Sequence, residues 1–237
     1  MSKQFSSVFL RAPRPAKTAG LGREQIVRAA VDLLDAEGTS ALSMRKLGAK
    51  LGAGATSLYW YVANKEQLQE LVLDEFWGMV DAPEPDGKSW REVLTTFGYN
   101  LRETMYAHPW STELIGAIPS LGPNAFETTD RLRRAFVQAG FHGIDIYMAS
   151  GTVMCFVLGQ VIPELAFRKA YGTDQIDPAT GISEHMAEFA EGYPEMLAEY
   201  QAQVSIDPAT ARAMAFDFGL LCVLDGLEAR LRKAHEL

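Results

Sequence analysis

The sequence predicts an all-α protein with a small N-terminal helical domain and a larger second helical domain. Apolar residues recur at helical spacing along almost the whole chain, and no stretch alternates in the manner of a β-strand. Glycine and proline cluster at a few places and leave long stretches between them. Hydrophobic residues make up 48% of the 237 residues, which is enough for a buried core and excludes a disordered composition.

The N-terminal third is expected to hold a basic arm followed by four helices. Residues 1–20 contain basic residues, no acidic residue and two prolines, so they predict a flexible basic arm. Within residues 21–81, Gly38 is a typical helix stop, and Ser43 and Asn64 are good N-caps for the second and fourth helices. The predicted helices cover residues 23–37, 44–51, 56–62 and 65–80.

A proline- and glycine-containing acidic stretch then separates the two predicted domains. Pro83, Pro85 and Gly87 lie close together, which places the boundary between residues 21–81 and residues 88–237. Ser89 caps the next helix, and Pro208 at the first helical position starts the last one. Further helices are expected over residues 90–108, 110–118, 124–139, 144–170 and 207–233, with weaker helical signals over residues 185–200.

The net charge of −8 is unevenly distributed along the chain. Up to Lys65 there are ten basic and four acidic residues, a net charge of +6. From Glu66 onward, 12 basic residues face 26 acidic ones, a net charge of −14. This asymmetry indicates that only the first part meets a polyanion, with a basic tail that has no partner as the alternative.

The second and third predicted helices, joined by a turn with two glycines, are typical of a helix-turn-helix. A recognition helix must be short, with small or polar residues at its start and a face anchored to the domain, here by Leu58 and Val62. The three aromatic residues 59–61 follow one another, so at least one of them must be exposed. Aromatic side chains with polar ends suit the sugar-phosphate backbone, and ordinary core packing is the alternative.

These N-terminal segments are similar to the DNA-binding domain of the TetR family of transcription regulators. The most specific run is Leu-Tyr-Trp-Tyr-Val-Ala-Asn-Lys at residues 58–65. Beyond the connector, Ser89-Trp90, Gly140-Phe141, Phe218-Gly-Leu and Asp225-Gly-Leu-Glu resemble the ligand-binding domain of the tetracycline-repressor subgroup. The resemblance covers residues 21–233. It implies a homodimer that binds a palindromic operator in double-stranded DNA and responds to a small-molecule effector, most often as a repressor, with no cofactor or metal.

The resemblance also implies which residues meet DNA. Arg45 is a candidate for bidentate contact with guanine, and a surface arginine with no base partner is the alternative. The start of the third helix would touch bases, the aromatic residues would meet sugars or phosphates, and Lys65 would contact a phosphate with help from the helix dipole. The full set is Ser43, Arg45, Ala55, Thr56, Ser57, Tyr59, Trp60, Tyr61 and Lys65.

The predicted recognition helix contains no Arg, Lys, Asn or Gln, so it is expected to discriminate only weakly between bases. We therefore expect the N-terminal arm to add affinity by lying in the minor groove, as homeodomain arms do. An unattached tail is the alternative. The arm residues concerned are Arg11, Arg14 and Lys17.

The two most apolar helices of the second domain, residues 144–170 and 207–233, are candidates for a dimer interface. The resemblance implies that the equivalent pair from each subunit forms a four-helix bundle. A monomer with a fully buried central helix would have the same composition. The interface candidates are Met148, Met214, Phe218, Leu221 and Leu224.

A ligand cavity between helices needs apolar walls and a few polar groups. The resemblance, and not the spacing, favours such a pocket over plain core packing. In a gap-free register, the polar drug- and metal-binding positions of the tetracycline repressor fall near Phe97, Leu101 and Ile115, so a hydrophobic or aromatic effector is expected instead of tetracycline. The candidate lining residues are Trp90, Phe97, Leu101, Met105, Trp110, Phe126, Met154 and Phe156.

No catalytic pattern stands out: the four histidines lack metal-ligand spacing, and there is no nucleophile elbow or phosphate-binding loop. The chain is therefore not expected to be an enzyme. The rival interpretation is a helical small-molecule-binding protein or hydrolase that no longer binds DNA. Intact Arg45, Tyr59, Trp60 and Lys65 argue against it.

A cytoplasmic protein without a membrane partner is expected. No apolar run approaches the ~20 residues that span a bilayer, and Val8-Phe9-Leu10 is too short for a signal peptide. Cys155 and Cys222 lie inside apolar stretches and are predicted to be reduced core residues.

Overall fold

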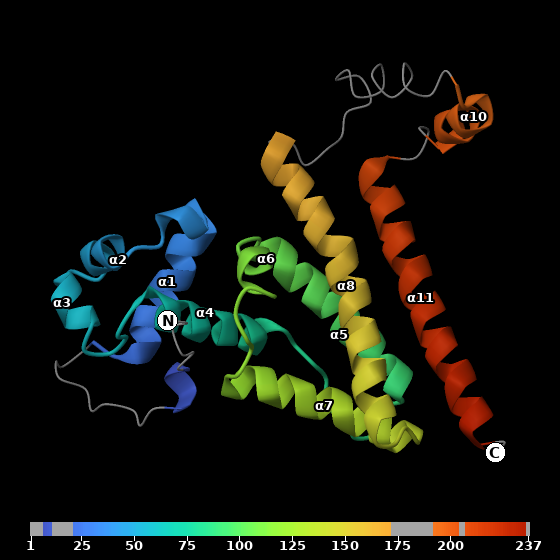
Figure 1. Cartoon of the computed structure of the whole chain (residues 1–237), viewed down its shortest axis with the longest axis horizontal. Coiled ribbons are helices and arrows are strands. Elements are labelled where there is room, and N and C mark those ends of the chain that lie inside the picture. Colours follow the sequence, from blue (N-terminus) through green and yellow to red (C-terminus); the bar gives the residue numbers. More distant parts are fainter. Residues whose placement is uncertain (1–6, 11–20, 172–191, 204–206, 236–237) are drawn as a thin grey trace, which may run out of the picture. The chain divides into compact units, whose positions relative to one another are not determined.

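The computed structural model describes residues 7–10, 21–171, 192–203 and 207–235, and these ranges contain helices and no strand (Figure 1). About 76% of the structure is helical, which confirms the predicted all-α fold class. In chain order the elements are η1 (Val8–Leu10), α1 (Arg23–Glu37), η2 (Thr39–Ala41), α2 (Met44–Lys50), α3 (Ala55–Leu58), α4 (Lys65–Met79), α5 (Trp90–Ala107), α6 (Ser111–Leu114), α7 (Pro123–Ala139), α8 (Ile144–Tyr171), α10 (Pro194–Gln203) and α11 (Pro208–His235).

The chain divides into two compact units, Met1–Cys155 and Phe156–Leu237. The division falls inside α8 and not at the proline-rich connector, where the sequence places the domain boundary. The reason is that α4 packs against both α1 and α7, so the segments on either side of the connector belong to one unit.

Side-chain caps fix the starts of three helices as predicted. Ser43 accepts a hydrogen bond from the Lys46 N–H, and Asn64 accepts one from the Gln67 N–H at 2.8 Å. Ser89 and Glu92 form a reciprocal capping box at the start of α5. Each cap satisfies an N–H group that has no partner within its own helix.

Two helices are shorter than expected. α3 ends at Leu58, and residues 59–61 form a turn in which the Tyr61 and Val62 N–H groups both donate to the Leu58 carbonyl. α6 ends at Leu114, and Gly116, with φ at 84°, turns the chain in a way that favours glycine.

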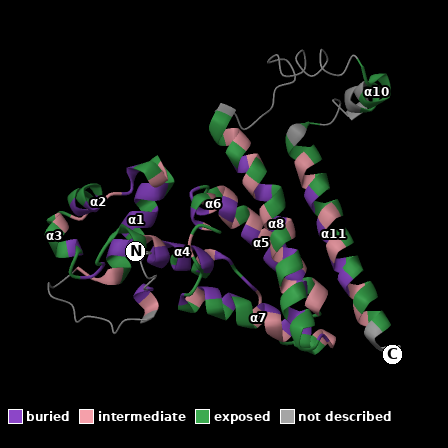
Figure 2. Cartoon of the chain, viewed as in Figure 1, coloured by how far each residue is buried: buried purple, intermediate pink, exposed green. Residues whose placement is uncertain are grey.

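Buried apolar side chains line α4 and α5 and form the core of the first unit (Figure 2). Phe76 of α4 meets Trp77 and Trp110 edge-on, with ring centroids 5.5 and 6.1 Å apart. Trp90, Phe136 and Phe141 form a second aromatic cluster where α5 meets α7. Such pairs add to the stabilisation that burial of apolar area provides.

A buried carboxylate joins α4 to α7. Asp74 is 6% exposed and accepts hydrogen bonds from the N–H groups of Ala125 at 3.0 Å and Asn124 at 3.4 Å, in the first turn of α7. Burial raises the pKa of Asp74 above its ordinary value, against the opposing effect of these backbone hydrogen bonds. Gly122 permits the approach, because a Cβ there would lie 2.1 Å from the Asp74 Cγ.

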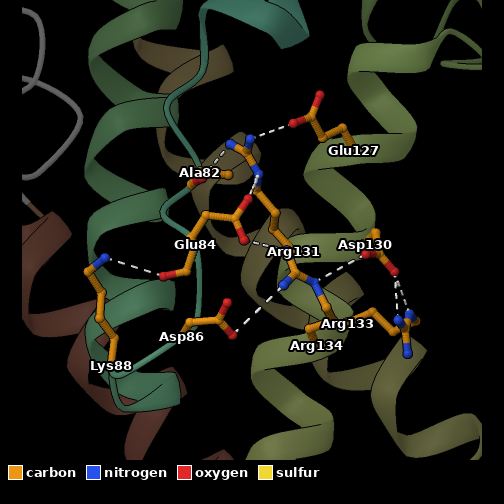
Figure 3. Close-up of polar contacts among 9 residues, drawn as sticks. All are labelled: Ala82, Glu84, Asp86, Lys88, Glu127, Asp130, Arg131, Arg133 and Arg134. Carbon is orange, nitrogen blue, oxygen red and sulfur yellow. Dashed lines mark hydrogen bonds and ion pairs between the residues drawn. The ribbon is translucent and has the colours of Figure 1, made fainter.

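The connector is fastened to α7 by a cluster of charged side chains (Figure 3). Arg131 donates to the Ala82 carbonyl at 2.8 Å and lies 2.9 Å from Glu84. Arg134 also pairs with Glu84, and this hydrogen bond lowers the pKa of Glu84 below its ordinary value. The connector is therefore held along α7 and does not act as a free hinge.

The second unit contains the end of α8 and the helices α10 and α11. Phe156 and Phe216 have ring centroids 5.4 Å apart, and Gly219 leaves room for the Phe156 ring, which a Cβ would approach to 2.4 Å. Glu164 of α8 lies 2.8 Å from Arg212 of α11. These contacts pair the two long helices within this unit.

One described helix departs from the expectation that no apolar stretch could span a bilayer. Ile144–Ala170 is long and apolar enough to cross a bilayer by length and composition, with a mean hydropathy of 1.5. Glycine, serine and threonine interrupt the apolar runs of this helix, so no single run is long. Its mean hydropathy nevertheless stays high, because these residues are only weakly polar. A core helix of a soluble protein passes the same test, so the finding is weak evidence for a membrane.

Two further expectations are wrong. Cys155 and Cys222 are exposed and are not core residues, because they lie on the outer faces of α8 and α11. The N-terminal segment is not flexible throughout: Ser7 and Val8 are buried, and Val8–Leu10 form a 3-10 turn against α4. Arg11, Arg14 and Lys17 lie outside the described residues.

The raised pKa of Asp74 predicts how stability depends on pH. The folded chain holds the Asp74 proton more tightly than the unfolded chain, so the contribution of this carboxyl group to stability falls as the pH rises through its folded pKa. Asp74→Asn keeps an acceptor oxygen but cannot ionise. We expect it to gain stability relative to wild type as the pH rises from about 4 to 7, measured by urea unfolding. Asp81→Asn, at an exposed carboxyl group, is the control. If the difference in the free energy of unfolding between Asp74→Asn and wild type stays constant with pH, the raised pKa of Asp74 is contradicted.

Gly48 of α2 predicts a second stability effect. A Cβ at Gly48 would lie 2.7 Å from the Ala53 carbonyl oxygen and 3.2 Å from the Ala55 nitrogen. Since both are backbone atoms, Gly48→Ala must shift the turn, and we expect a loss of about 1–3 kcal/mol in the free energy of unfolding. Gly54→Ala, where a Cβ meets nothing within 4 Å, should cost clearly less. Equal losses for the two variants would show that the close approach is unimportant.

Candidate nucleic-acid interface

The helix-turn-helix is held together by backbone contact and by a small apolar core. The Ala53 N–H donates to the Gly48 carbonyl at 2.9 Å, which folds the turn onto α2. Leu47 of α2, Leu58 of α3 and Val62 are fully buried. These anchors fix the face of α3 that is turned toward the domain, so the start of α3 remains at the surface.

The structure exposes most of the residues predicted to meet DNA. Arg45, Thr56, Ser57 and Lys65 are exposed, while Ser43 and Ala55 are half-buried. They come from the start of α2, the start of α3 and the start of α4, the three places where the resemblance expects operator contacts.

The aromatic triplet divides between surface and core. Tyr59 is 47% and Trp60 is 37% exposed, as the adjacency of the three residues requires for at least one of them. Tyr61 is only 9% exposed. The expectation that Tyr61 meets the DNA backbone is therefore corrected: the turn after Leu58 directs this ring into the domain.

The basic residues of α2 differ in their partners. Lys46 lies 2.6 Å from Glu37 and Lys50 lies 3.3 Å from Asp32, so two lysines of α2 are paired with carboxylates at the end of α1. Within the described residues, neither Arg45 nor Lys65 has an acidic partner. These two cations are therefore available to an approaching phosphate.

The end of α1 is tied to the start of α6 by a contact that sequence reasoning missed. One oxygen of Asp35 accepts from Trp110 Nε1 at 2.6 Å and lies 2.7 Å from His108 Nδ1. The Thr39 hydroxyl also donates to Glu113. Asp35 and Trp110 are 75 residues apart, so no local pattern could reveal their contact.

Helix α4 connects the helix-turn-helix to the rest of the first unit. Its first residue, Lys65, is exposed at the start of the helix, where the Asn64 side chain supplies the cap. Near its other end, Trp77 Nε1 donates to the Ser120 hydroxyl at 2.9 Å. A shift of α4 would therefore disturb both Lys65 and the loop before α7.

The residues predicted to line a ligand pocket have different environments. Phe97, Leu101 and Met105 of α5 are fully buried, and Trp110 is 3% exposed. Trp90, Met154 and Phe156 are half-buried, and Phe156 belongs to the second unit. Phe126 is 61% exposed on α7, so within this chain it lies at the surface and lines no interior.

One polar group in this region was missed from the sequence. The Ser111 hydroxyl at the start of α6 is buried and has no hydrogen-bond partner within the described structure. A buried hydroxyl without a partner is uncommon. It is the kind of group that a bound molecule with an acceptor atom would satisfy.

Four of the five predicted interface residues are exposed. Met148 on α8 and Met214, Phe218 and Leu221 on α11 are 54–73% exposed, and Phe218 is the most exposed of them. Leu224 is 1% exposed, because it lies on the inner face of α11, and it is unavailable to a second copy.

Two family models match the chain. The model for bacterial regulatory proteins of the tetR family matches residues 26–72, which contain most of α1, all of α2 and α3, and the first half of α4. The model for the tetracyclin repressor-like C-terminal domain matches residues 82–231, which begin at the connector.

Named relatives agree with these matches. An HTH-type transcriptional regulator of Saccharopolyspora erythraea is 35% identical over 197 residues, covering 83% of this chain and 82% of the relative. The tetracycline repressor protein class E of Escherichia coli is 30% identical over 222 residues, covering 92% of this chain and 96% of the repressor.

Solved structures agree as well. The Streptomyces coelicolor TetR family protein ActR in complex with actinorhodin has a TM-score of 0.74 and 27% identity, covering 90% of this chain and 99% of that one. BioQ with its natural double-stranded DNA operator has a TM-score of 0.59 and 25% identity, covering 88% and 99% of the two chains. The sequence resemblance is thereby confirmed, and the chain belongs to the TetR family of bacterial transcriptional regulators.

Proposed function

We propose that the chain is a cytoplasmic repressor that binds a palindromic operator as a homodimer and leaves it when a small hydrophobic or aromatic effector binds. The observation that carries the proposal is the exposed start of α3, flanked by Arg45 and Lys65. Within the described residues, these two cations have no acidic partner.

Charge and shape support binding to DNA. The residues up to Lys65 carry a net charge of +6 in a chain whose total is −8. A short helix with exposed small side chains can enter the major groove, and exposed cations beside it can contact phosphates. The related BioQ has been solved with its natural double-stranded operator. We propose Ser43, Arg45, Ala55, Thr56, Ser57, Tyr59, Trp60 and Lys65 as the DNA contacts, with Arg11, Arg14 and Lys17 adding affinity.

Exposed apolar surface supports a dimer. A single short recognition helix reads too few base pairs for a specific site, so two copies must read two half-sites. α8 carries Tyr147 and Met148 at the surface, and α11 carries Met214, Phe218 and Leu221. Large exposed apolar side chains on successive turns are typical of an interface. A dimer that covers α8 also accounts for its high mean hydropathy without a membrane.

The effector is proposed to bind among the apolar residues of α5 and α6. Phe97, Leu101 and Met105 give this region an apolar character, and the buried Ser111 hydroxyl lacks a partner within the described structure. The related ActR has been solved with actinorhodin. A ligand that prefers a displaced α4 would change the separation of the two recognition helices. A few kcal/mol of differential affinity would release the operator.

Selection of bound duplexes from a random pool tests the proposal. The full-length protein should retain palindromic duplexes whose half-sites are about one helical turn apart, with an affinity that falls as salt rises. Compounds can then be tested for release of the selected duplex. Failure to enrich any palindrome at moderate salt would contradict the proposal and favour a small-molecule-binding protein without a DNA partner.

Two substitutions should separate base reading from phosphate binding. Lys65→Ala should weaken binding to all duplexes alike and lower the salt slope by about two for a dimer, since each phosphate contact contributes about 0.9. Arg45→Ala should cost about 1–3 kcal/mol on the selected operator and relax the preference at one position of each half-site. Lys233→Ala, on the exposed surface of α11, is the control. If the affinity of Lys65→Ala for DNA depends on salt as steeply as that of wild type, Lys65 makes no phosphate contact.

The dimer proposal predicts the effect of a charge on α11. Phe218→Asp places a carboxylate on a side chain that is 73% exposed in the single chain, so it should fold but fail to pair. Sedimentation should then give a monomer, and affinity for the palindrome should fall by at least about tenfold. Val137→Asp, on an exposed apolar residue of α7, is the matched control and should leave the dimer intact. A wild-type monomer would contradict the assignment.

A further inference from the structure

Ser7 and Val8 are both hydrogen-bonded to one carboxylate oxygen of α4. The Ser7 hydroxyl donates to Glu70 Oε2 at 2.6 Å, and the Val8 N–H donates to the same oxygen at 3.1 Å. The Ser7 oxygen accepts in turn from the Phe9 N–H at 3.2 Å, which closes the start of η1. A side chain of α4 therefore binds residues that precede it by 63 and 62 positions in the chain.

Burial makes this contact different from a surface hydrogen bond. Ser7 is 0%, Val8 is 2% and Glu70 is 5% exposed. A carboxylate removed from water needs hydrogen-bond donors, because a buried charge without them is strongly unfavourable. Among the described residues, its donors are Ser7 and Val8. Removing the segment would leave the Glu70 carboxylate with neither partner until water reached it.

Because Glu70 lies on α4, its contact with Ser7 and Val8 restrains that helix. Asp74 lies four residues later on the same helix, and residues at this spacing lie on one face. Asp74 holds the first turn of α7, whereas Glu70 holds η1. Two successive turns of α4 are thus restrained by η1 and by α7, which are far apart in the sequence, and Lys65 stands five residues before Glu70.

We propose that Ser7–Leu10 is an intrachain clamp on α4, with Glu70 as its receptor, and that Glu70 is a positioning residue for operator binding. This role rests on the proposed function, since α4 begins with the Lys65 that is proposed to contact a phosphate. The clamp fixes the direction of α4 relative to the operator, and its loss lets α4 shift without altering any DNA-contacting side chain.

A double-mutant cycle in the full-length protein tests the clamp. The variants are Ser7→Ala, Glu70→Ala and the two combined, each compared with wild type in urea unfolding and in affinity for the selected palindrome. Because both substitutions break the same hydrogen bond, the double variant should be little worse than Glu70→Ala alone. We expect Glu70→Ala to weaken operator binding about tenfold and Ser7→Ala about threefold.

Hydrogen exchange of the Val8 amide adds a readout that a general loss of stability would not produce. In wild type this amide should exchange at least about tenfold more slowly than in Glu70→Ala, under conditions where both proteins remain folded. Glu70→Gln keeps an acceptor oxygen for Ser7 and Val8 and should restore most of the protection. The matched control is Glu75→Ala, which removes an exposed carboxylate from the same helix and should change neither readout.

Three results would overturn the clamp: rapid exchange of the Val8 amide in wild type, additive effects of Ser7→Ala and Glu70→Ala, or unchanged operator affinity in both single variants. If Glu70→Ala does not fold, Ser7→Ala and Glu70→Gln still decide the question. Failure of wild type to bind any palindrome would contradict the proposed function instead, and the unfolding cycle and the exchange of the Val8 amide would still test the clamp.

Discussion

The burial of two carboxylates on α4 is the constraint on which the first unit depends. Glu70 and Asp74 are 5% and 6% exposed, and each must find N–H or O–H donors inside the protein. Glu70 finds them in η1 and Asp74 finds them at the start of α7. Burial of apolar area is non-directional, whereas a hydrogen bond requires a donor at a defined place, so the two buried carboxylates favour one position of α4. These polar contacts therefore give α4 a defined place relative to η1 and α7.

Other contacts reinforce the same arrangement. Asp35 ties the end of α1 to Trp110, and Arg131 and Arg134 hold the connector along α7. The helix-turn-helix is thereby linked to the later helices of the first unit by α4, by the α1 contact and by the connector. Movement of α4 requires several of these contacts to change together, which is the property that a two-state regulator needs.

Local patterns predicted much of the fold. Ser43, Asn64 and Ser89 were recognisable as N-caps because capping depends on a side chain and on N–H groups only three residues away. Helix lengths were less predictable: α3 stops at Leu58 although the apolar spacing continues to Val62. The exposure of Cys155, Cys222 and Phe126 was misjudged, since a helix in an apolar stretch still has an outer face and composition does not say which residue lies on it.

The sequence by itself determined the helical class, the helix-turn-helix and the family, because these depend on short-range spacing and on a specific run at residues 58–65. Only the tertiary structure decided that Tyr61 is buried, that Leu224 lies on the inner face of α11, and that Ser7 meets Glu70. The physical reason is the same in each case. Burial and hydrogen bonding between residues far apart in the chain depend on how whole helices pack, and no local pattern records that packing.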